Sequence, residues 1–186
     1  MKLDIKKFNP CKEGLAYYKS KHSFAAAWKG CHRGDWMLWM APRLGVDDRI
    51  LIRAKALCAN TVRDLIGDKR ITGVIDASLR YADGEIDREE LYDFGKLASY
   101  AYRQTVFRKS SENHAISAAI NVFGNYILSY AVAIETADAR YRGAPLKTSL
   151  DEKRENERQT ASICREVLTD AVMEKVKQLT YNTILK

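Results

Sequence analysis

Apolar residues recur every three or four positions along nearly the whole chain, and short polar or glycine-containing breaks separate these runs. No run alternates apolar and polar residues for long enough to predict a strand. The pattern predicts an all-α protein, a multi-helix bundle of about seven helices, with a short α-solenoid-like stack of helical hairpins as the alternative.

The first thirty residues carry signals for two short helices. An amphipathic segment over residues 12–21 predicts the first of them. Ser23 is a favourable N-cap for the second helix, and Gly30 is expected to end it.

A third predicted helix holds the most aromatic segment of the chain. Asp35 can cap its N-terminus, and Pro42 is expected to end or kink it. Trp36, Trp39 and Met40 follow one another at i, i+3 and i+4 spacing, which places all three on one face. We therefore expect this face to anchor the hydrophobic core.

Capping residues also delimit the middle of the chain. Asp47 and Asp48 open a long amphipathic helix that is predicted to continue to Leu65 and to close at Gly67. A shorter helix follows, and Gly84 is expected to end it.

Asp87 and Ser149 are each followed three residues later by a glutamate, which is the spacing of a capping box. The first pair predicts a helix that runs toward Phe107. The second pair predicts a final helix that reaches about Thr180.

Residues 115–134 are twenty residues without a formal charge, which is long enough to span a bilayer. A polar break over residues 110–113 precedes them, and Gly143 is expected to end the helix. We predict one continuous core helix rather than a membrane span. Asn121 and Asn125 lie one turn apart and form a polar stripe, and no cluster of Lys and Arg flanks either end.

Length and composition agree with one helical domain over residues 1–186. Hydrophobic residues make up 46% of the chain, which is enough for a sizeable core. Three Pro and ten Gly are too few for the frequent chain reversals of an all-β fold.

The cysteines indicate free thiols, because no two of the four share CxxC spacing and a chain of this length needs no disulfide. No apolar leader is visible at the N-terminus, so we expect a cytoplasmic protein. Cys31 and His32, with Cys11 and His22, fit no standard zinc spacing, and a cysteine-protease pair is a further alternative. No phosphate loop, HExxH or GxSxG motif is present, so we expect no metal, no cofactor, no catalytic residue and no enzymatic activity.

Positive charge is concentrated at the N-terminus. The formal net charge of the whole chain is +7, and residues 1–30 hold seven Lys against two acidic residues. Residues 1–70 form a basic third, and residues 71–186 are neutral to slightly acidic. Such a surface suits an acidic protein or a nucleic acid, and it equally suits solubility. The candidate partner-binding residues are Lys6, Lys7, Lys12, Lys19, Lys21, Lys29 and Arg33.

Arg33, Gly34 and Asp35 spell the cell-adhesion tripeptide, but here they stand at a predicted helix start. We expect Arg33 and Asp35 to form a hydrogen-bonded corner, with Gly34 allowing a tight turn. The corner and its neighbours Cys31, Trp36 and Trp39 form the candidate structural motif.

The chain resembles the all-α immunity-protein family of bacterial polymorphic toxin systems, which also occurs in phage genomes. The resemblance extends over nearly the whole chain, and the segment from the first cysteine to the tryptophans carries its specificity. The matching segments are Cys11–Leu15, Ala27-Trp28 with Cys31, Arg33–Trp36 through Leu38-Trp39, Arg49 to Cys58-Ala59, Gly84–Glu90, Ala115–Ala139, and Glu157, Gln159 and Arg165.

The resemblance implies a small protein that binds a toxin or effector protein and neutralises it by steric occlusion, without catalysis. A sequence pI near 9.2 differs from the acidic surface with which immunity proteins against nucleases commonly mimic nucleic acid. Two alternatives therefore remain. One is a phage-encoded counter-defence protein, an anti-CRISPR-like inhibitor of a nucleic-acid-guided nuclease that uses the basic N-terminal region. The other is a nucleic-acid-binding module.

Overall fold

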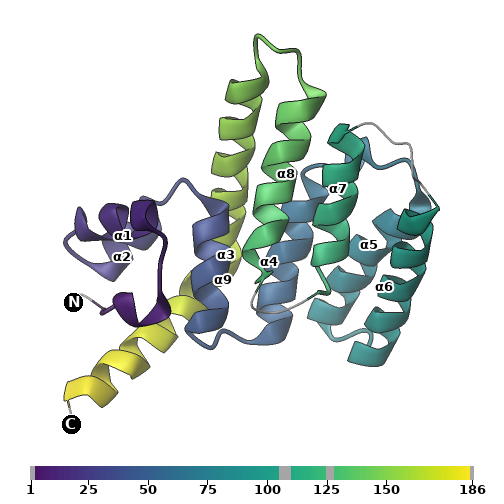
Figure 1. Cartoon of the computed structure of the whole chain (residues 1–186). Coiled ribbons are helices and arrows are strands. Elements are labelled where there is room, and N and C mark those ends of the chain that lie inside the picture. Colours follow the sequence, from purple (N-terminus) through teal and green to yellow (C-terminus); the bar gives the residue numbers. More distant parts are fainter. Residues whose placement is uncertain (1–2, 105–109, 125–127, 185–186) are drawn as a thin grey trace.

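A computed structural model describes residues 3–104, 110–124 and 128–184, and this part of the chain is helical with no strand (Figure 1). It confirms the predicted all-α bundle, although it contains nine α-helices rather than about seven. Their bounds are α1 Lys12–Lys19, α2 Phe24–Lys29, α3 Gly34–Arg43, α4 Asp48–Asn60, α5 Lys69–Asp83, α6 Arg88–Arg103, α7 Ser110–Asn121, α8 Tyr130–Gly143 and α9 Ser149–Ile184. Within residues 3–104 there are also two single-turn 3₁₀ helices, η1 (Lys6–Phe8) and η2 (Arg63–Leu65).

Several helix boundaries follow the predicted caps. Ser23 accepts a hydrogen bond from the Ala26 amide at 3.1 Å, and Asp87 accepts one from the Glu90 amide at 2.9 Å. Gly84 ends α5 in a left-handed conformation with φ of 83°, which a residue without a Cβ adopts at little cost. These caps depend on local hydrogen bonds, which is why the sequence pattern reveals them.

Helix α4 is shorter than predicted, because it ends at Asn60 and Leu65 belongs to η2. The hydroxyl of Thr61 donates to the carbonyl of Cys58 at 2.7 Å, and this bond takes a carbonyl that a continuing helix would use. The helix predicted to start at Asp87 is α6, and its predicted continuation to Phe107 lies outside the described residues.

The prediction of one continuous helix over residues 115–134 is wrong. Helix α7 ends at Asn121 and α8 begins at Tyr130, and the two pack side by side (Figure 1). The expected polar break over residues 110–113 is instead the first turn of α7. Two short helices can bury small apolar faces against each other, whereas a single long helix would expose them. The buried small residues are Ala115, Ala118 and Ala119 on α7 and Ala133, Ala137 and Ala139 on α8.

Helix α9 closes the bundle by packing against α8, α4 and α3. These contacts between the end of the chain and its first third distinguish the bundle from a solenoid, in which only neighbouring hairpins touch. The predicted capping box at Ser149 does not form, because Ser149 is the first residue of α9 and the amide of Glu152 donates to the Thr148 carbonyl at 3.0 Å. No helix in the described ranges is both long enough and apolar enough to cross a membrane.

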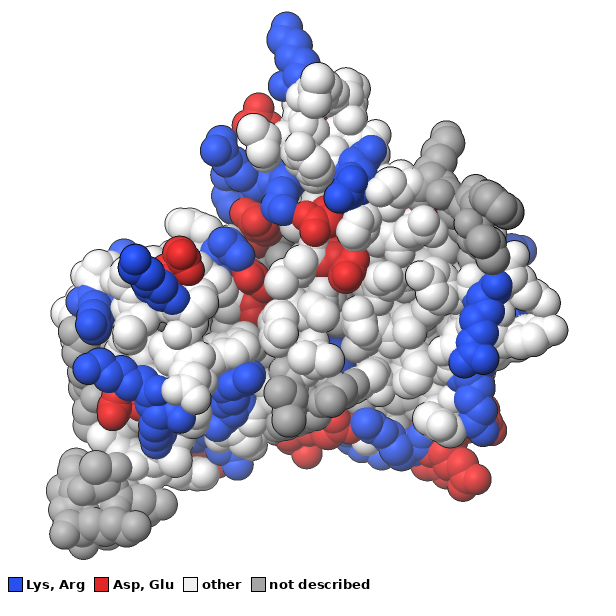
Figure 2. Space-filling model, viewed as in Figure 1, with Lys and Arg blue, Asp and Glu red and all other residues white. Residues whose placement is uncertain are grey.

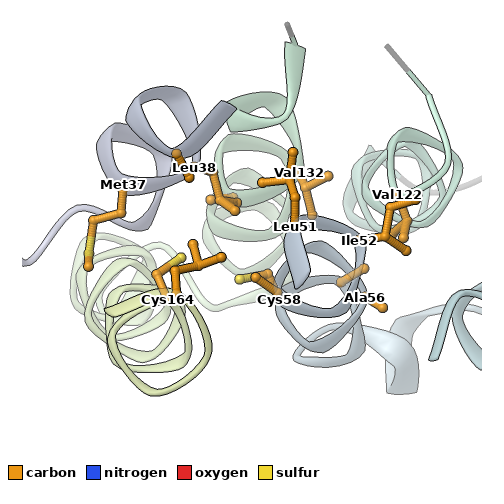
Figure 3. Packing of buried hydrophobic residues seen from close by; sticks show 14 of the residues in the cluster. Met37, Leu38, Leu51, Ile52, Ala56, Cys58, Val122, Val132 and Cys164 are labelled. Atoms are coloured by element: carbon orange, nitrogen blue, oxygen red, sulfur yellow. The ribbon is translucent and has the colours of Figure 1, made fainter. Parts of the chain in front are cut away.

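The centre of the bundle is formed by side chains from α3, α4, α8 and α9 (Figure 3). Leu38 of α3 points toward Leu51 of α4 and Val132 of α8, whereas Met37 lies on the side of α3 that faces α9, and all four are almost fully buried. This packing fixes the orientation of α3, and therefore fixes which of its side chains face outward.

Residues 3–31, which we call the N-terminal module, comprise η1, α1 and α2 and lie beside α3 and the later turns of α9 (Figure 1). The indole Nε1 of Trp28 donates to Thr169 Oγ1 of α9 at 3.0 Å. The phenol of Tyr18 donates to the carbonyl of Leu3 at 2.7 Å. The first bond holds the module against α9, and the second ties Leu3 to α1 within the module.

Candidate binding groove beside the N-terminal module

The N-terminal module and α3 border a groove of about 540 Å³, and the first turns of α8 contribute Tyr130 and Ile134 to it. This volume lies in the usual range for ligand and side-chain binding sites. Aromatic side chains dominate the lining: Tyr17, Tyr18, Phe24, Trp28, Trp36 and Trp39.

The two tryptophans of α3 face this groove, which corrects the expectation that they anchor the core. Trp36 and Trp39 are half-buried, whereas Met40 is buried as predicted. The core positions of the helix are instead Met37 and Leu38. The i, i+3 spacing correctly places both tryptophans on one face, but that face borders the groove.

Cations lie over both indole rings. The guanidinium carbon of Arg33 is 4.9 Å from the ring centre of Trp36, and that of Arg43 is 4.3 Å from Trp39. Burial lowers the pKa of Arg43, whose Nη1 donates to the Trp39 carbonyl at 2.8 Å. Arginine stacked on tryptophan is a common composition of protein-binding hot spots.

The wall opposite α3 is held rigid by hydrogen bonds and ring contacts. Tyr17 donates to the carbonyl of Ala27 at 2.9 Å and packs against Trp36 with 5.7 Å between ring centres. Phe24 stacks on Trp28 at 6.1 Å. A groove with such fixed walls loses little conformational entropy when it is filled.

The predicted corner of Arg33 and Asp35 is present at the edge of the groove. Nε of Arg33 donates to Oδ1 of Asp35 at 2.9 Å, and Nη2 donates to Oδ2 at 2.7 Å. This pairing raises the pKa of Arg33. Asp35 does not cap α3, because the helix begins at Gly34 and has no side-chain cap. The carboxylate is already held by the guanidinium.

Gly34 is required by packing rather than by its backbone conformation. A Cβ at this position would lie 2.4 Å from Oγ1 of Thr160 on α9. The carbonyl of Gly34 also accepts a bond from the thiol of Cys164 at 3.8 Å. The glycine thus lets the start of α3 lie directly against α9.

A smaller pocket of about 130 Å³ adjoins the groove and shares Arg33, Asp35 and Ile134 with it. Lys153 and Glu157 of α9 supply its other charged side chains. The Arg33 and Asp35 pair therefore stands between an aromatic groove and a charged pocket.

The predicted partner-binding lysines lie on the N-terminal module, over which blue side chains spread in Figure 2. All are exposed except Lys21, which is half-buried with its ammonium 5.0 Å from the ring centre of Tyr17. None of them lines the groove itself. In the described part of the chain, no ion pair with a carboxylate forms at Lys6, Lys7, Lys12, Lys21 or Lys29.

The cysteines are free thiols, as predicted, and three of the four are buried. Cys31 donates to the carbonyl of Arg33 at 3.4 Å, and burial raises the pKa of its thiol. The pKa of Cys164 is also raised, first by a hydrogen bond with Cys58 and then by burial. Within the described ranges, no three His, Cys, Asp or Glu side chains are placed to hold a metal ion.

The sequence pattern did not reveal the two groove residues that α8 contributes, Tyr130 and Ile134. These two lie one turn apart, a spacing that could have placed them on one face. That α8 begins at Tyr130 could not be predicted, because the uncharged stretch over residues 115–134 predicts a single continuous helix. Comparison of the chain with protein-family models, with curated protein sequences and with solved structures found no match in any of the three.

Proposed function

We propose that this protein is a non-enzymatic binding protein that neutralises a partner protein, such as a toxin or effector, by steric occlusion. The observation that supports the proposal best is the aromatic groove of about 540 Å³ between the N-terminal module and α3. Its rigid walls and stacked arginines suit one or two large apolar side chains of a partner. The resemblance to immunity proteins implies the same kind of activity.

The charge around the groove narrows the class of partner. Lys6, Lys7 and Lys12 are exposed cations without ion pairs in the described part of the chain. They would attract an acidic surface and speed its association, while burial of apolar side chains in the groove would provide most of the affinity. The partner is therefore a protein that carries an apolar protrusion within an acidic surface.

The test compares wild-type protein with the double variant Trp36→Gln, Trp39→Gln. Both are used to capture proteins from the native host, and the captured candidate is then purified and titrated against each. Leu146→Gln is the matched control, because Leu146 is 90% exposed and lies far from the groove in the α8–α9 turn.

We expect a fixed stoichiometry with the wild type and the control, and loss of binding in the tryptophan variant. Association should slow as salt rises from about 50 mM to about 500 mM, because the attraction by the lysines is screened, whereas the dissociation rate should change little, because an apolar interface is weakly screened. Equal binding by the tryptophan variant, with its fold verified by circular dichroism, would refute the proposal.

A second candidate is the anti-CRISPR-like inhibitor or nucleic-acid-binding module, and the lysines without ion pairs favour it. Its test is the variant Lys6→Glu, Lys7→Glu, Lys12→Glu against single-stranded and duplex nucleic acid. A matched control changes Lys69, Arg142 and Lys147 to Glu, since these cations are exposed elsewhere on the molecule. Binding that falls steeply with salt and is lost only in the first variant would favour this candidate.

A further inference from the structure

Helix α6 lies at the edge of the bundle away from the N-terminal module (Figure 1), and several large apolar side chains stand on its exposed surface. Tyr92 is 56% exposed and Tyr100 is 59% exposed. In the described part of the chain, four of the nine exposed large hydrophobic side chains belong to this one helix. Tyr92 and Tyr100 are eight residues apart and therefore lie on the same side of the helix, and two exposed tyrosines on one side indicate a contact surface.

The inner face of α6 is firmly seated, so its outer face is a rigid surface. Leu91, Ala98 and Ala101 are buried against the bundle. A Cβ at Gly95 would lie 2.4 Å from the ring of Phe123, which shows how closely the helix approaches its neighbour. The tyrosines point away from these contacts and do not take part in the core.

The outer face has a symmetric order about Lys96. Tyr92 and Tyr100 stand four residues before and after it, and Glu89 and Arg103 stand seven residues before and after it. Because these intervals are close to one and two helical turns, all five residues lie along one stripe. An antiparallel copy of the same helix would place tyrosine opposite tyrosine and glutamate opposite arginine.

The charges along this stripe are complementary to a second copy. Neither Glu89 nor Arg103 forms an ion pair in the described part of the chain. The ammonium of Lys96 donates to Asp93 Oδ1 at 2.7 Å and lies 4.8 Å from the ring centre of Tyr92. If two copies pair through this stripe, their Lys96 side chains would come close together. Each Lys96 ammonium is already neutralised by Asp93 of its own chain, so the two would repel each other little.

We propose that a second copy of this chain binds here, with the two α6 helices antiparallel and a twofold axis near Lys96. Each such contact would form twice, as a closed twofold interface requires. A helix of 16 residues is about 24 Å long, so the contact is small and the dimer should dissociate on dilution. Both grooves would face outward, and the proposal does not depend on what they bind.

The test is sedimentation velocity from about 10 µM to about 1 mM, the range in which small interfaces dissociate. We expect concentration-dependent dimerisation of the wild type and its loss in Tyr92→Ser, Tyr100→Ser. The matched control is Leu150→Gln, because Leu150 is also 59% exposed but lies on α9. Dimerisation should be unchanged in this control.

Charge exchange tests the antiparallel register. Glu89→Arg and Arg103→Glu should each weaken self-association about tenfold, because like charges then face each other twice. The double variant Glu89→Arg, Arg103→Glu should restore it, and so should an equimolar mixture of the two single variants. A wild type that stays monomeric up to about 1 mM, or charge variants without rescue, would overturn the proposal.

Discussion

A buried lysine offers the sharpest test of the energetics of this fold. Lys55 lies on α4 and is only 1% exposed, and it forms no ion pair in the described part of the chain. Burial lowers its pKa from 10.5 to about 8, although nearby Asp48 favours the charged form. Asp48 already accepts bonds from Tyr81, at 3.1 Å, and from Arg88. We predict that Lys55→Met stabilises the protein.

The size of the effect follows from the pKa. A pKa of about 8 in the folded state against 10.5 in the unfolded state corresponds to about 3 kcal/mol, at 1.36 kcal/mol per pKa unit. Because the folded pKa is the lower one, the unfolded state binds more protons between pH 8 and 10.5. The cost of Lys55 is therefore fully present at pH 7 and disappears as the pH rises through this window.

The assay is urea unfolding of the wild type and Lys55→Met at several pH values from 7 to 10.5. At pH 7 the variant should be more stable by about 2–3 kcal/mol, with its thermal midpoint raised by about 5–10 °C. This gain should shrink toward zero by pH 10.5. The raised pKa values of Tyr17 and Cys31 destabilise both proteins alike at high pH, so they cancel in the difference.

Lys147→Met serves as the control, since an exposed lysine should change the free energy of unfolding by less than about 0.5 kcal/mol. A variant at Lys55 that is less stable than the wild type at pH 7 would refute the reasoning. A gain that stays constant from pH 7 to 10.5 would also refute it, because packing alone would then explain the change.

Three further outcomes are expected. Gly34→Ala should cost about 1–3 kcal/mol in urea unfolding, because its Cβ would lie 2.4 Å from Thr160 Oγ1; full stability would contradict the close approach of α3 and α9. Gly95→Ala should cost a similar amount, and Phe123→Leu should recover part of it by removing the clashing ring edge. With a thiol reagent at neutral pH, one cysteine, Cys11, should react in the folded protein, and the remaining three should react only after denaturation.

Local features of this fold were predictable because they depend on neighbouring residues. The caps at Ser23 and Asp87 and the end of α5 at Gly84 involve residues no more than a few positions apart. The Arg33 and Asp35 corner is of the same kind. Such features need no knowledge of which helices later pack together.

Residues 115–134 show a feature of the fold that the local sequence could not predict. Their composition is compatible with one long helix or with two short ones, and they carry no charge to decide between them. The break after Asn121 allows α7 and α8 to bury their alanine faces against each other. That choice depends on the free energy of packing two helices, which no single segment contains.

The amino-acid sequence by itself determined the helical class, many of the helix ends and the concentration of positive charge at the N-terminus. It also placed Trp36 and Trp39 on one face, because helical spacing is a local property. Only the tertiary structure decided that this face borders a groove, and that Lys55 is buried among apolar helices. Both depend on contacts between segments far apart in the chain, whose apolar surfaces must all be covered at once.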